Sequence, residues 1–329
     1  MSFNCYKDII EEGDTVILYI NPQAMYAIQA LSIIENRKGE KVENIMQTKY
    51  GALKISSLFG KRFGSKVNLS NGWAYVLYPT PELWTQTLPH RTQIIYTPDI
   101  GLIMFMLELK PGSIVVESGT GSGSLTHAMA FRVKPSGHIY TYDFHEQRAE
   151  QAQKEFKSHG LSDIVTSQCR DVCQNGFSDE VVGKADAVFL DLPHPHLVVP
   201  FAIKALKSTG GGRICTFSPC IEQVMRTCQV LKDHGFIQLT TIECLEKEYQ
   251  VLNRTVTTFT GIRQLPSTDS QSQNAAAEES AGPAEKKFVA CVPSACPRGH
   301  TGYLTTATYL MENPLSRRSD TEGENKCEN

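Results

Sequence analysis

The spacing of hydrophobic positions changes near residue 80. Before that point, short runs such as TVILYI (15–20) and WAYVLY (73–78) look like strands, and turn residues such as Asn71-Gly72 separate them. Short β-favouring runs bounded by Gly, Pro and Asn are typical of strands joined by turns. We therefore predict a small, barrel-like β domain over residues 1–80, followed by a linker with a crossing helix over residues 81–112.

Strand-like and helix-like runs alternate over residues 113–265. Strands are predicted for SIVVE, HIYTYD, IVTSQC, ADAVFL, RICTF and IQLTTIEC, and helix-like runs lie between most of them. Strands that alternate with helices indicate parallel βαβ units. The predicted fold class is therefore α/β, with a doubly wound, Rossmann-like sheet. The run HTGYLTTATYL falls within residues 299–312 and is expected to return the chain to this sheet.

Two segments have a composition that opposes folding. Residues 266–287 contain no Leu, Ile, Val, Met or aromatic residue. Such a stretch cannot bury enough apolar area to offset the entropy cost of ordering it. We predict a disordered insertion over residues 266–298 and a disordered, polar tail over residues 313–329.

The clearest chemical signal is the glycine-rich run ESGTGSGSLT, residues 117–126, which follows a predicted strand and opens a predicted helix. Gly119, Gly121 and Gly123 carry no Cβ atom, so the backbone can turn tightly and approach a ligand closely. Their G-x-G-x-G spacing differs from the G-x-G-x-x-G of dinucleotide sites, and no P-loop lysine follows. The spacing therefore counts against NAD, the nearest rival ligand.

Acidic residues stand at three successive strand ends. Glu117 directly precedes the glycines, where a carboxylate suits an ammonium group. Asp143 ends the next strand, where a carboxylate can accept both hydroxyls of a ribose. Asp171 follows the third strand and is placed to receive an adenine amino group. An ammonium group, a ribose and an adenine in that order describe S-adenosylmethionine (SAM), which is the predicted cofactor.

The fourth strand of this series ends in Asp191-Leu192-Pro193. Ligands of open α/β sheets bind at the carboxyl ends of the strands, so this carboxylate is expected to face the site. It can accept a hydrogen bond from the exocyclic amine of a base and hold a ring nitrogen in line with a methyl donor. Asp191 is therefore the candidate catalytic residue, with a loop-capping aspartate as the alternative. We interpret His194 and His196 as exposed loop side chains.

Composition narrows the class of protein. With 329 residues, 41% of them apolar and 20% charged, and a net charge of −3, the chain has a folded, soluble composition. Its longest apolar stretch, residues 100–107, is far shorter than the roughly 18 residues of a membrane span. The N-terminus has no secretory pattern. The ten cysteines form no C-x-x-C pair, so we expect neither a membrane partner nor a metal.

One segment is locally basic. Between residues 44 and 81 there are five basic residues and no acidic one, and six aromatic residues are interleaved with them. Basic side chains neutralise phosphates, and aromatic rings stack on unpaired bases. The pattern predicts RNA binding by the small β domain. The basic count is modest, so we expect another subunit to supply more positive surface.

Several motifs together resemble one family, the catalytic subunits of eukaryotic tRNA (adenine-58, N1) methyltransferases. The resemblance rests on FGSKV, PTPELWT, LPHRTQI, ESGTGSGS, FHEQRAE, DAVFLDLP, FSPCIEQV and GHTGYLT, which extend over nearly the whole chain. It implies methyl transfer from SAM to N1 of adenine 58 in the tRNA T-loop, and to T-loop-like adenines in mRNA. One departure is Asp143, where the family pattern leads us to expect the longer Glu.

The resemblance also implies residue roles. With the loop residues Glu117, Gly119 and Gly121, the expected SAM contacts are Ile95, Ser122, Gly123, Ser124, Leu125, Asp143, Arg148, Asp171, Val172 and Asp191. The expected tRNA contacts are Lys49, Tyr50, Gly51, Gly72, Trp73, Gln93, Leu190, Pro193, Thr216, Ser218, Pro219, Gln223 and Thr301.

The resemblance implies a partner as well: a non-catalytic, sequence-related RNA-binding subunit, with two copies of each chain in a heterotetramer. It also implies a nuclear location. Two alternatives stay open at this point. One is a SAM-dependent protein methyltransferase of the isoaspartyl type, and the other is a non-catalytic RNA-binding scaffold.

Overall fold

The computed structural model describes residues 3, 6–36, 38–88, 92–207, 210–258, 284–294 and 299–310. The chain divides into two compact units. One contains Met1–Cys244 and Thr301–Asn329, and the other is Leu245–His300.

The first unit begins with a small antiparallel β domain, as the sequence predicts. Four strands form one sheet in the order β2–β1–β8–β7: β1 (Thr15–Asn21), β2 (Ala24–Gln29), β7 (Lys66–Leu69) and β8 (Gly72–Leu77). Two hairpins accompany it: β3 (Ile33–Glu35) with β4 (Lys41–Glu43), and β5 (Ile45–Thr48) with β6 (Gly51–Lys54). A single-turn 3-10 helix, η1 (Ile55–Leu58), follows. Alternate strand residues such as Val16, Leu18 and Val76 are buried in one core.

Two helices join this domain to the main sheet. Helix α1 (Pro81–Thr87) is capped by Thr80, whose side chain accepts a hydrogen bond from the Leu83 N–H, and Pro81 fits the first helical turn. Helix α2 (Thr97–Met106) also has a proline in its first turn. The linker predicted over residues 81–112 thus contains two helices, where the sequence analysis expected one.

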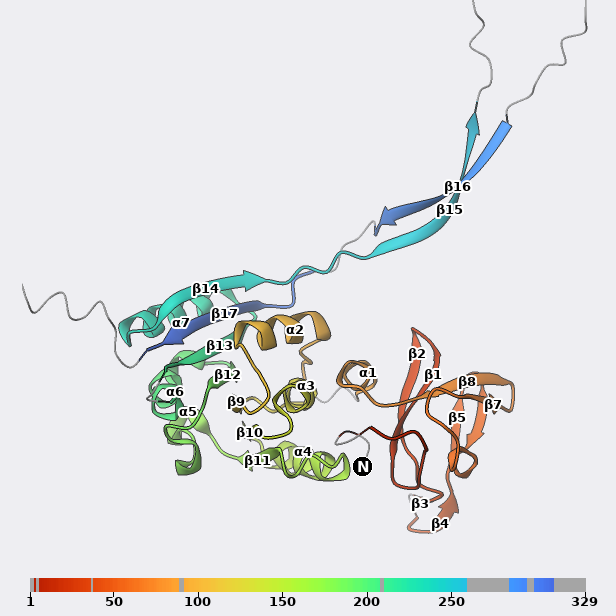
Figure 1. The fold of residues 1–329 in the computed structure, drawn as a ribbon, viewed down its shortest axis with the longest axis horizontal. Coiled ribbons are helices and arrows are strands. Elements are labelled where there is room, and N and C mark those ends of the chain that lie inside the picture. The colour runs from red at the N-terminus through yellow and green to blue at the C-terminus, as the bar shows by residue number, and fades with distance from the viewer. Residues whose placement is uncertain are drawn as a thin grey trace, which may run out of the picture. The chain divides into compact units, whose positions relative to one another are not determined.

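The main sheet has seven strands in the order β11–β10–β9–β12–β13–β17–β14 (Figure 1). Five strands are parallel: β9 (Ile114–Ser118), β10 (His138–Asp143), β11 (Val165–Cys169), β12 (Ala187–Asp191) and β13 (Gly212–Ser218). Strand β17 (Tyr303–Tyr309) runs antiparallel between β13 and β14 (Ile237–Glu243). The doubly wound sheet and the return of the chain near residue 303 are both confirmed.

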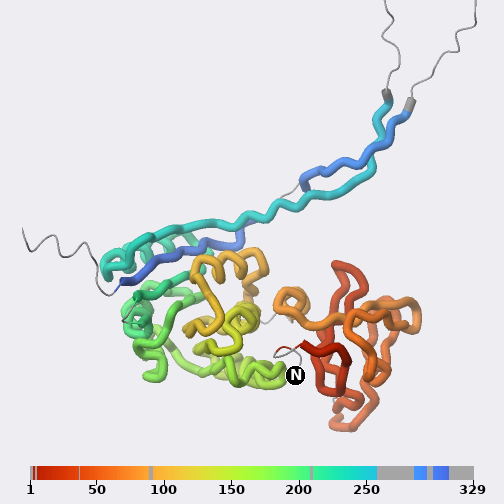
Figure 2. The backbone as a smooth tube through the Cα atoms, viewed as in Figure 1, coloured from red at the N-terminus to blue at the C-terminus, as the bar shows by residue number. Residues whose placement is uncertain are grey.

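Helices cover both faces of this sheet (Figures 1 and 2). One face packs against α2, α3 (Ser124–Val133) and α4 (Glu146–Ser158). The other packs against α5 (Val172–Asn175), α6 (Val199–Ala205) and α7 (Ile221–Asp233), with the single turns η2 (Asp179–Val181) and η3 (Pro195–Leu197) nearby. Strand residues are apolar on both faces because both are buried, as parallel sheets require.

The second unit corrects two sequence predictions. Strand β15 (Tyr249–Thr258) pairs antiparallel with β16 (Ala284–Pro293) over ten residue pairs. Residues 284–293 are therefore ordered, although the insertion was predicted as disordered over 266–298, and the SAM-binding domain ends near residue 244 instead of 265. Pairing with β15 gives the backbone N–H and C=O groups of β16 hydrogen-bond partners. The amino-acid composition of residues 284–293 alone does not indicate this pairing. The remaining residues 266–283 and 295–298, and the predicted tail 313–329, lie outside the described residues.

Candidate active site

The chain reverses direction across the sheet at one point. From β9 it steps outward to β10 and β11, then returns to β12 on the other side of β9. Ligands of doubly wound sheets bind at the carboxyl ends of the strands at such a switch point. The glycine loop follows β9, and Asp191 ends β12. The two strongest chemical signals of the sequence therefore lie together.

Gly119 touches the backbone of Asp191. Its φ angle is +96°, and a Cβ atom built there would clash with the carbonyl oxygen of Asp191. Gly121 and Gly123 also have positive φ angles, of 52° and 73°. L residues with side chains rarely adopt this conformation. The loop therefore needs glycine at position 119 for close approach as well as for backbone conformation.

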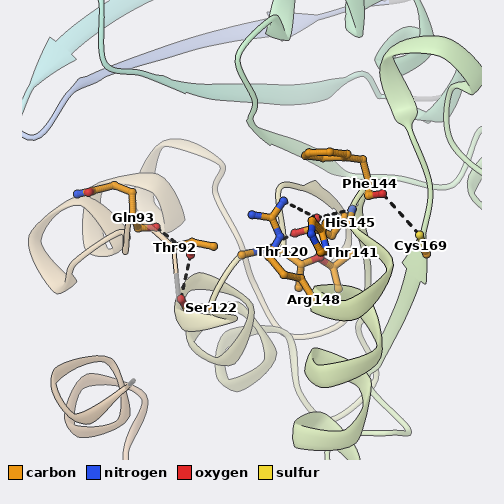
Figure 3. Close-up of polar contacts among 11 residues, drawn as sticks. Thr92, Gln93, Thr120, Ser122, Thr141, Phe144, His145, Arg148 and Cys169 are labelled. Carbon is orange, nitrogen blue, oxygen red and sulfur yellow. Dashed lines mark hydrogen bonds and ion pairs between the residues drawn. The ribbon is translucent and has the colours of Figure 1, made fainter. Parts of the chain in front are cut away.

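Hydrogen bonds hold the loop to β10 (Figure 3). The Gly119 N–H donates to the Tyr142 carbonyl oxygen at 2.9 Å, and the hydroxyls of Thr120 and Thr141 lie 2.6 Å apart. The Gly121 N–H donates to Asp143 Oδ2 at 3.2 Å. The loop and the carboxylate predicted to bind ribose are thus parts of one network.

The carboxylate of Asp143 is buried and has two further partners. Its Oδ1 atom accepts a hydrogen bond from the His145 N–H at 2.9 Å and lies 3.1 Å from Nη2 of Arg148. The Arg148 guanidinium also lies 5.3 Å from the ring centroid of Phe144, whose side chain is 66% exposed (Figure 3). An exposed aromatic ring directly after the carboxylate that is predicted to bind ribose is a flat surface suited to a purine.

The candidate residues line two adjoining cavities that share Gln93, Gly119, Gly121 and Asp191. The larger, of about 220 Å³, is also lined by Thr92, Asp143, Phe144, Arg148, Leu192 and Pro193. The smaller is also lined by Ile94, Ile95, Glu117, Thr120, Ser122, Ser124 and Leu125. Two larger hollows, of about 430 and 490 Å³, flank helix α4, but the glycine loop and the carboxylates that end the strands line neither.

Glu117 lies at the floor of the smaller cavity and is 1% exposed. Its Oε2 atom accepts a hydrogen bond from the Thr126 hydroxyl at 2.7 Å. Burial raises the pKa of Glu117 to about 7. Hydrogen bonds from Thr126 and Thr141 lower this pKa, and the nearby charges of Asp191 and Asp143 raise it. A cationic group bound beside it would favour the ionised form.

Asp191 lies on the wall common to both cavities and is half-buried. Burial raises the pKa of its carboxyl to about 6. No hydrogen bond of its side chain is found among the described residues. A carboxylate with unoccupied acceptor positions at a cavity wall can bind a donor from a ligand, which an aspartate that only caps a loop cannot do.

The other predicted cofactor residues divide into two groups. Ile95, Ser122, Ser124 and Leu125 line the smaller cavity, and the Ser124 hydroxyl donates to the Ile95 carbonyl oxygen at 3.0 Å. Asp171 and Val172 line neither cavity.

The carboxylate of Asp171 caps helix α5, because its Oδ1 atom accepts hydrogen bonds from the N–H groups of Cys173 and Gln174. Val172 is 2% exposed. The adenine contact predicted for Asp171 and the SAM contact predicted for Val172 stay predictions.

Five residues that line the two cavities were missed by the sequence predictions. Thr92, Phe144 and Leu192 line the larger cavity, and Ile94 and Thr120 line the smaller one. The Thr92 and Ser122 hydroxyls lie 2.9 Å apart and join the segment before α2 to the glycine loop (Figure 3). Phe144 and Leu192 each directly follow a predicted functional carboxylate, and that adjacency could have found them.

The described residues contain no group of three or more His, Cys, Asp or Glu side chains that could hold a metal ion. No helix in the described part of the chain is long and apolar enough to cross a bilayer.

Similarity to known proteins agrees with this geometry. Residues 72–309 match the family described as the tRNA methyltransferase complex GCD14 subunit. A relative from Dictyostelium discoideum, named tRNA (adenine(58)-N(1))-methyltransferase catalytic subunit trmt61a, is 39% identical over 315 residues, covering 92% of this chain and 97% of the relative. The chain belongs to the GCD14 family.

Other members and solved structures extend the GCD14 match. The TRM61 catalytic subunit of Candida albicans is 42% identical, over 76% of this chain and 72% of its own length. A SAM-dependent O-methyltransferase from Thermotoga maritima matches with a TM-score of 0.70 and 25% identity, over 93% of this chain and 96% of its own. The tRNA (m1A58) methyltransferase TrmI from Aquifex aeolicus has the same fold, with a TM-score of 0.63, 23% identity, and coverage of 92% and 99%.

These similarities confirm the family, the SAM-dependent methyltransferase fold and SAM as the cofactor, all of which the sequence predicted. The roles of individual residues stay predictions, and the structure shows where each of these residues lies.

The predicted tRNA contacts near Asp191 lie in different places. Gln93 and Pro193 line the larger cavity, and the exposed Pro219 lies beyond β13. The Gln223 side chain donates to the Pro193 carbonyl oxygen at 2.9 Å, which links helix α7 to the loop after Asp191. These residues lie at the carboxyl edge of the sheet, in or next to the loops that follow β12 and β13 and the segment before α2.

Three further predicted tRNA contacts have buried side chains. The side chains of Leu190, Thr216 and Ser218 are fully buried. Their strands lie inside the sheet, and alternation turns these side chains toward the core beneath α6 and α7 instead of the cavity. Only the backbone of these three residues is placed to reach a ligand, and their predicted contacts with tRNA stay predictions.

The predicted contacts in the small domain cluster at two adjoining turns. A Cβ atom on Gly51 would lie 2.5 Å from the Asn71 nitrogen, and one on Gly72 would lie 3.5 Å from the Tyr50 carbonyl oxygen. Both turns therefore pack closely together. Nearby, the Lys66 ammonium lies 4.0 Å from the ring centroid of Trp73, which is 45% exposed.

Proposed function

We propose that this chain is the catalytic subunit of a SAM-dependent tRNA methyltransferase, which methylates N1 of adenine 58 in the T-loop of tRNA and also T-loop-like adenines in mRNA. Relatives of similar length are named for this tRNA activity. The observation that carries the proposal is Asp191, a half-buried carboxylate with available acceptor positions where the glycine loop meets β12.

The residues at the switch point fit SAM. Backbone without side chains lines the cavity at Gly119 and Gly121, so an extended ligand can lie against the loop. The Glu117 carboxylate would hold the ammonium group, Asp143 the ribose hydroxyls, and the exposed ring of Phe144 the adenine. When bound, SAM supplies a methyl group already activated by its positively charged sulfur.

Asp191 orients the target base. With its pKa near 6, the carboxyl is mostly ionised at neutral pH and accepts a hydrogen bond from the adenine N6 amine. That bond would hold N1 toward the methyl donor, and the negative charge would stabilise the positive charge that develops on the ring. The methyl transfer needs no covalent intermediate with the protein, because the N1 lone pair is itself the nucleophile.

Access to N1 requires the nucleotide to leave its tertiary pairing, which costs a few kcal/mol. The small β domain offers a surface for the displaced RNA. Lys66 lies over the exposed ring of Trp73, and Tyr75 packs edge-on against Trp73 at 5.3 Å. Cations beside exposed rings can bind phosphates and stack on unpaired bases.

We further propose that the chain works with a non-catalytic, RNA-binding subunit, as two copies of each, in the nucleus; the compartment follows from the resemblance alone. Support for a protein partner comes from the hairpin of β15 and β16. A two-stranded ribbon is marginally stable by itself in water. Exposed apolar side chains lie on both of its faces, with Val251 and Val289 on one and Leu252 and Phe288 on the other.

The proposed function is tested by incubating the co-purified subunits with labelled SAM and unmodified tRNA, then mapping the modified nucleoside. We expect 1-methyladenosine at position 58. The Asp191→Asn variant keeps the shape of the side chain but lacks its charge. It is expected to lose at least about 100-fold in methyl transfer, with SAM affinity within about threefold of wild type.

Label at another base, or on protein instead of RNA, would contradict the proposed substrate. Methyl transfer at the wild-type rate by Asp191→Asn would remove Asp191 from the mechanism. Binding of tRNA without any transfer by the wild-type complex would favour the scaffold alternative.

A further inference from the structure

A buried carboxylate lies outside the cavities described above. Asp99, in the first turn of α2, is 2% exposed. Its Oδ2 atom accepts a hydrogen bond from the Thr301 hydroxyl at 3.0 Å, whereas its Oδ1 atom is buried with no hydrogen-bond partner among the described residues. Burial raises the pKa of Asp99. Burying an incompletely paired carboxylate costs stability, so its presence calls for a function.

The partner of Asp99 is at the catalytic edge of the sheet. Thr301 is exposed and directly precedes Gly302, where a Cβ atom would lie 2.5 Å from the Phe217 ring. Phe217 is paired in register with Asp191 on one side and with Leu304 on the other. Neighbouring strands are about 4.8 Å apart, so the path of β17 at Leu304 is roughly 10 Å from Asp191. Thr301 extends from there over the carboxyl edge.

The hydrogen bond to Asp99 determines whether the Thr301 hydroxyl can donate a hydrogen bond to a ligand or accept one from it. A hydroxyl has one proton to donate and two lone pairs that accept. An ionised carboxylate only accepts, so the single proton of Thr301 points inward to Asp99. The exposed side of the Thr301 oxygen therefore presents lone pairs and selects a hydrogen-bond donor.

We infer that Asp99 is a positioning residue that holds the Thr301 hydroxyl as an acceptor for a ribose 2′-hydroxyl of the RNA beside the target nucleotide. This inference rests on the proposed function, because it takes RNA as the substrate. Among the donors of RNA, the 2′-hydroxyl is present at every nucleotide and absent from DNA, which suits an acceptor that lies near the backbone of the chain being held.

The test uses the complex of both subunits and four variants. Thr301→Val keeps the shape of the side chain and removes the hydroxyl, Thr301→Ser restores it, and Asp99→Leu removes the acceptor that orients it. Thr308→Val is the matched control on the same strand, because the Thr308 hydroxyl bonds to Gln238 at the far end of β17. Each is assayed for SAM affinity, for melting temperature, and for kcat and KM with tRNA.

We expect Thr301→Val to lower kcat/KM for tRNA by about 3- to 10-fold, which is the typical effect of losing one hydrogen bond. The loss should appear mainly in the KM for tRNA, with SAM affinity unchanged. Thr301→Ser should restore most of it, and Thr308→Val should leave it unaltered. Asp99→Leu should reproduce the loss even after correction for any change in folded fraction.

Substrates with one 2′-deoxy nucleotide, placed in turn at the target and its neighbours, identify the group that is bound. At one position the deoxy substitution should weaken wild type and have no further effect on Thr301→Val. Additive losses at every position would contradict a 2′-hydroxyl contact, and would point to a base amine if Thr301→Val is still impaired. Full activity of Thr301→Val would overturn this inference and leave the proposed function standing. A wild-type complex inert on tRNA would overturn the proposed function, and this inference with it.

Discussion

Three carboxylates of similar chemistry occupy the switch point, and their surroundings separate them. Glu117, Asp143 and Asp191 project on the same side of their strands, toward the layer of α2, α3 and α4. Asp143 has an arginine and two N–H partners, Glu117 accepts hydrogen bonds from the hydroxyls of Thr126 and Thr141, and Asp191 lies at a cavity wall. Sequence position alone makes them look equivalent, whereas their partners suit them to different tasks.

The rate of methyl transfer should depend on the ionisation of Asp191. Its raised pKa means that the charged form is present above about pH 6 and is lost as the pH falls through that value. We expect kcat/KM for tRNA to fall by about tenfold per pH unit below pH 6, measured with the complex in buffers of constant ionic strength. The residual activity of Asp191→Asn should lack this acid limb; the same limb in both proteins would assign it to another group.

Replacing Glu117 by Gln should stabilise the protein and weaken cofactor binding. The folded state holds the Glu117 proton more tightly than the unfolded state, so stability falls as the pH rises from about 4.5 to about 7. We expect Glu117→Gln to raise the free energy of unfolding at pH 8 by about 1–3 kcal/mol without SAM, measured by denaturant titration. Calorimetry should show SAM affinity reduced at least tenfold, and unchanged affinity would argue against an ammonium contact.

At the scale of elements, the backbone of the glycine loop at Gly119 lies directly against the backbone of β12 at Asp191. Ala at position 119 would place a methyl group against the Asp191 carbonyl oxygen and would have to adopt a positive φ angle. We expect Gly119→Ala to abolish measurable SAM binding in calorimetry. The control is Gly183→Ala, which has a φ angle of +68° but open space around the Cβ position. If both variants bind SAM equally, close approach at Gly119 has no role.

A buried histidine pair supports the same loop from α3. Nδ1 of His127 donates to the Gly123 carbonyl oxygen at 2.6 Å, so its Nε2 accepts a hydrogen bond from Nδ1 of His159 at 2.8 Å. Phe3 and Trp84 pack against both rings. Because the rings have little access to water, the pair is arranged to be neutral.

This pair should make the fold sensitive to acid. Burial lowers the pKa of His159 to about 2, with a further contribution from His127, whereas an unfolded histidine titrates near 6.5. The unfolded state therefore binds the proton, and stability falls below pH 6.5 by up to about 1.4 kcal/mol per pH unit. His159→Gln keeps a donor but cannot titrate. Its unfolding free energy between pH 5 and 6.5 should fall less steeply, and parallel curves would disprove the assignment.

At the scale of the whole molecule, the unit Leu245–His300 contains the hairpin of β15 and β16, which has an exposed apolar surface of its own. We expect the double variant Val251→Glu, Val289→Glu to reduce association with the partner subunit, because two charges would be buried without counter-ions. Size-exclusion chromatography of the co-expressed subunits measures this. Gln250→Glu, at an exposed polar position of the same hairpin, is the control. An intact complex in the double variant would place the partner elsewhere.

Much of the site could be predicted from sequence because its signals are local. A strand followed by closely spaced glycines, and a strand that ends in Asp-Leu-Pro, each describe one turn of backbone. Predictions failed or stayed incomplete where a contact joins distant segments. Composition around residue 284 could not reveal pairing with β15, and the motif around Leu190 and Thr216 could not show which side of the strand faces the core.

The order of strands and helices, the positions of the functional carboxylates, and the need for backbone without side chains at residue 119 are written in the sequence, because each depends on neighbours along the chain. Only the tertiary structure decided which carboxylate has available acceptor positions, that Asp171 caps a helix, and that Asp99 turns the Thr301 hydroxyl inward. Those properties arise from groups far apart in the chain, whose mutual burial and hydrogen bonding exist only once the sheet has assembled.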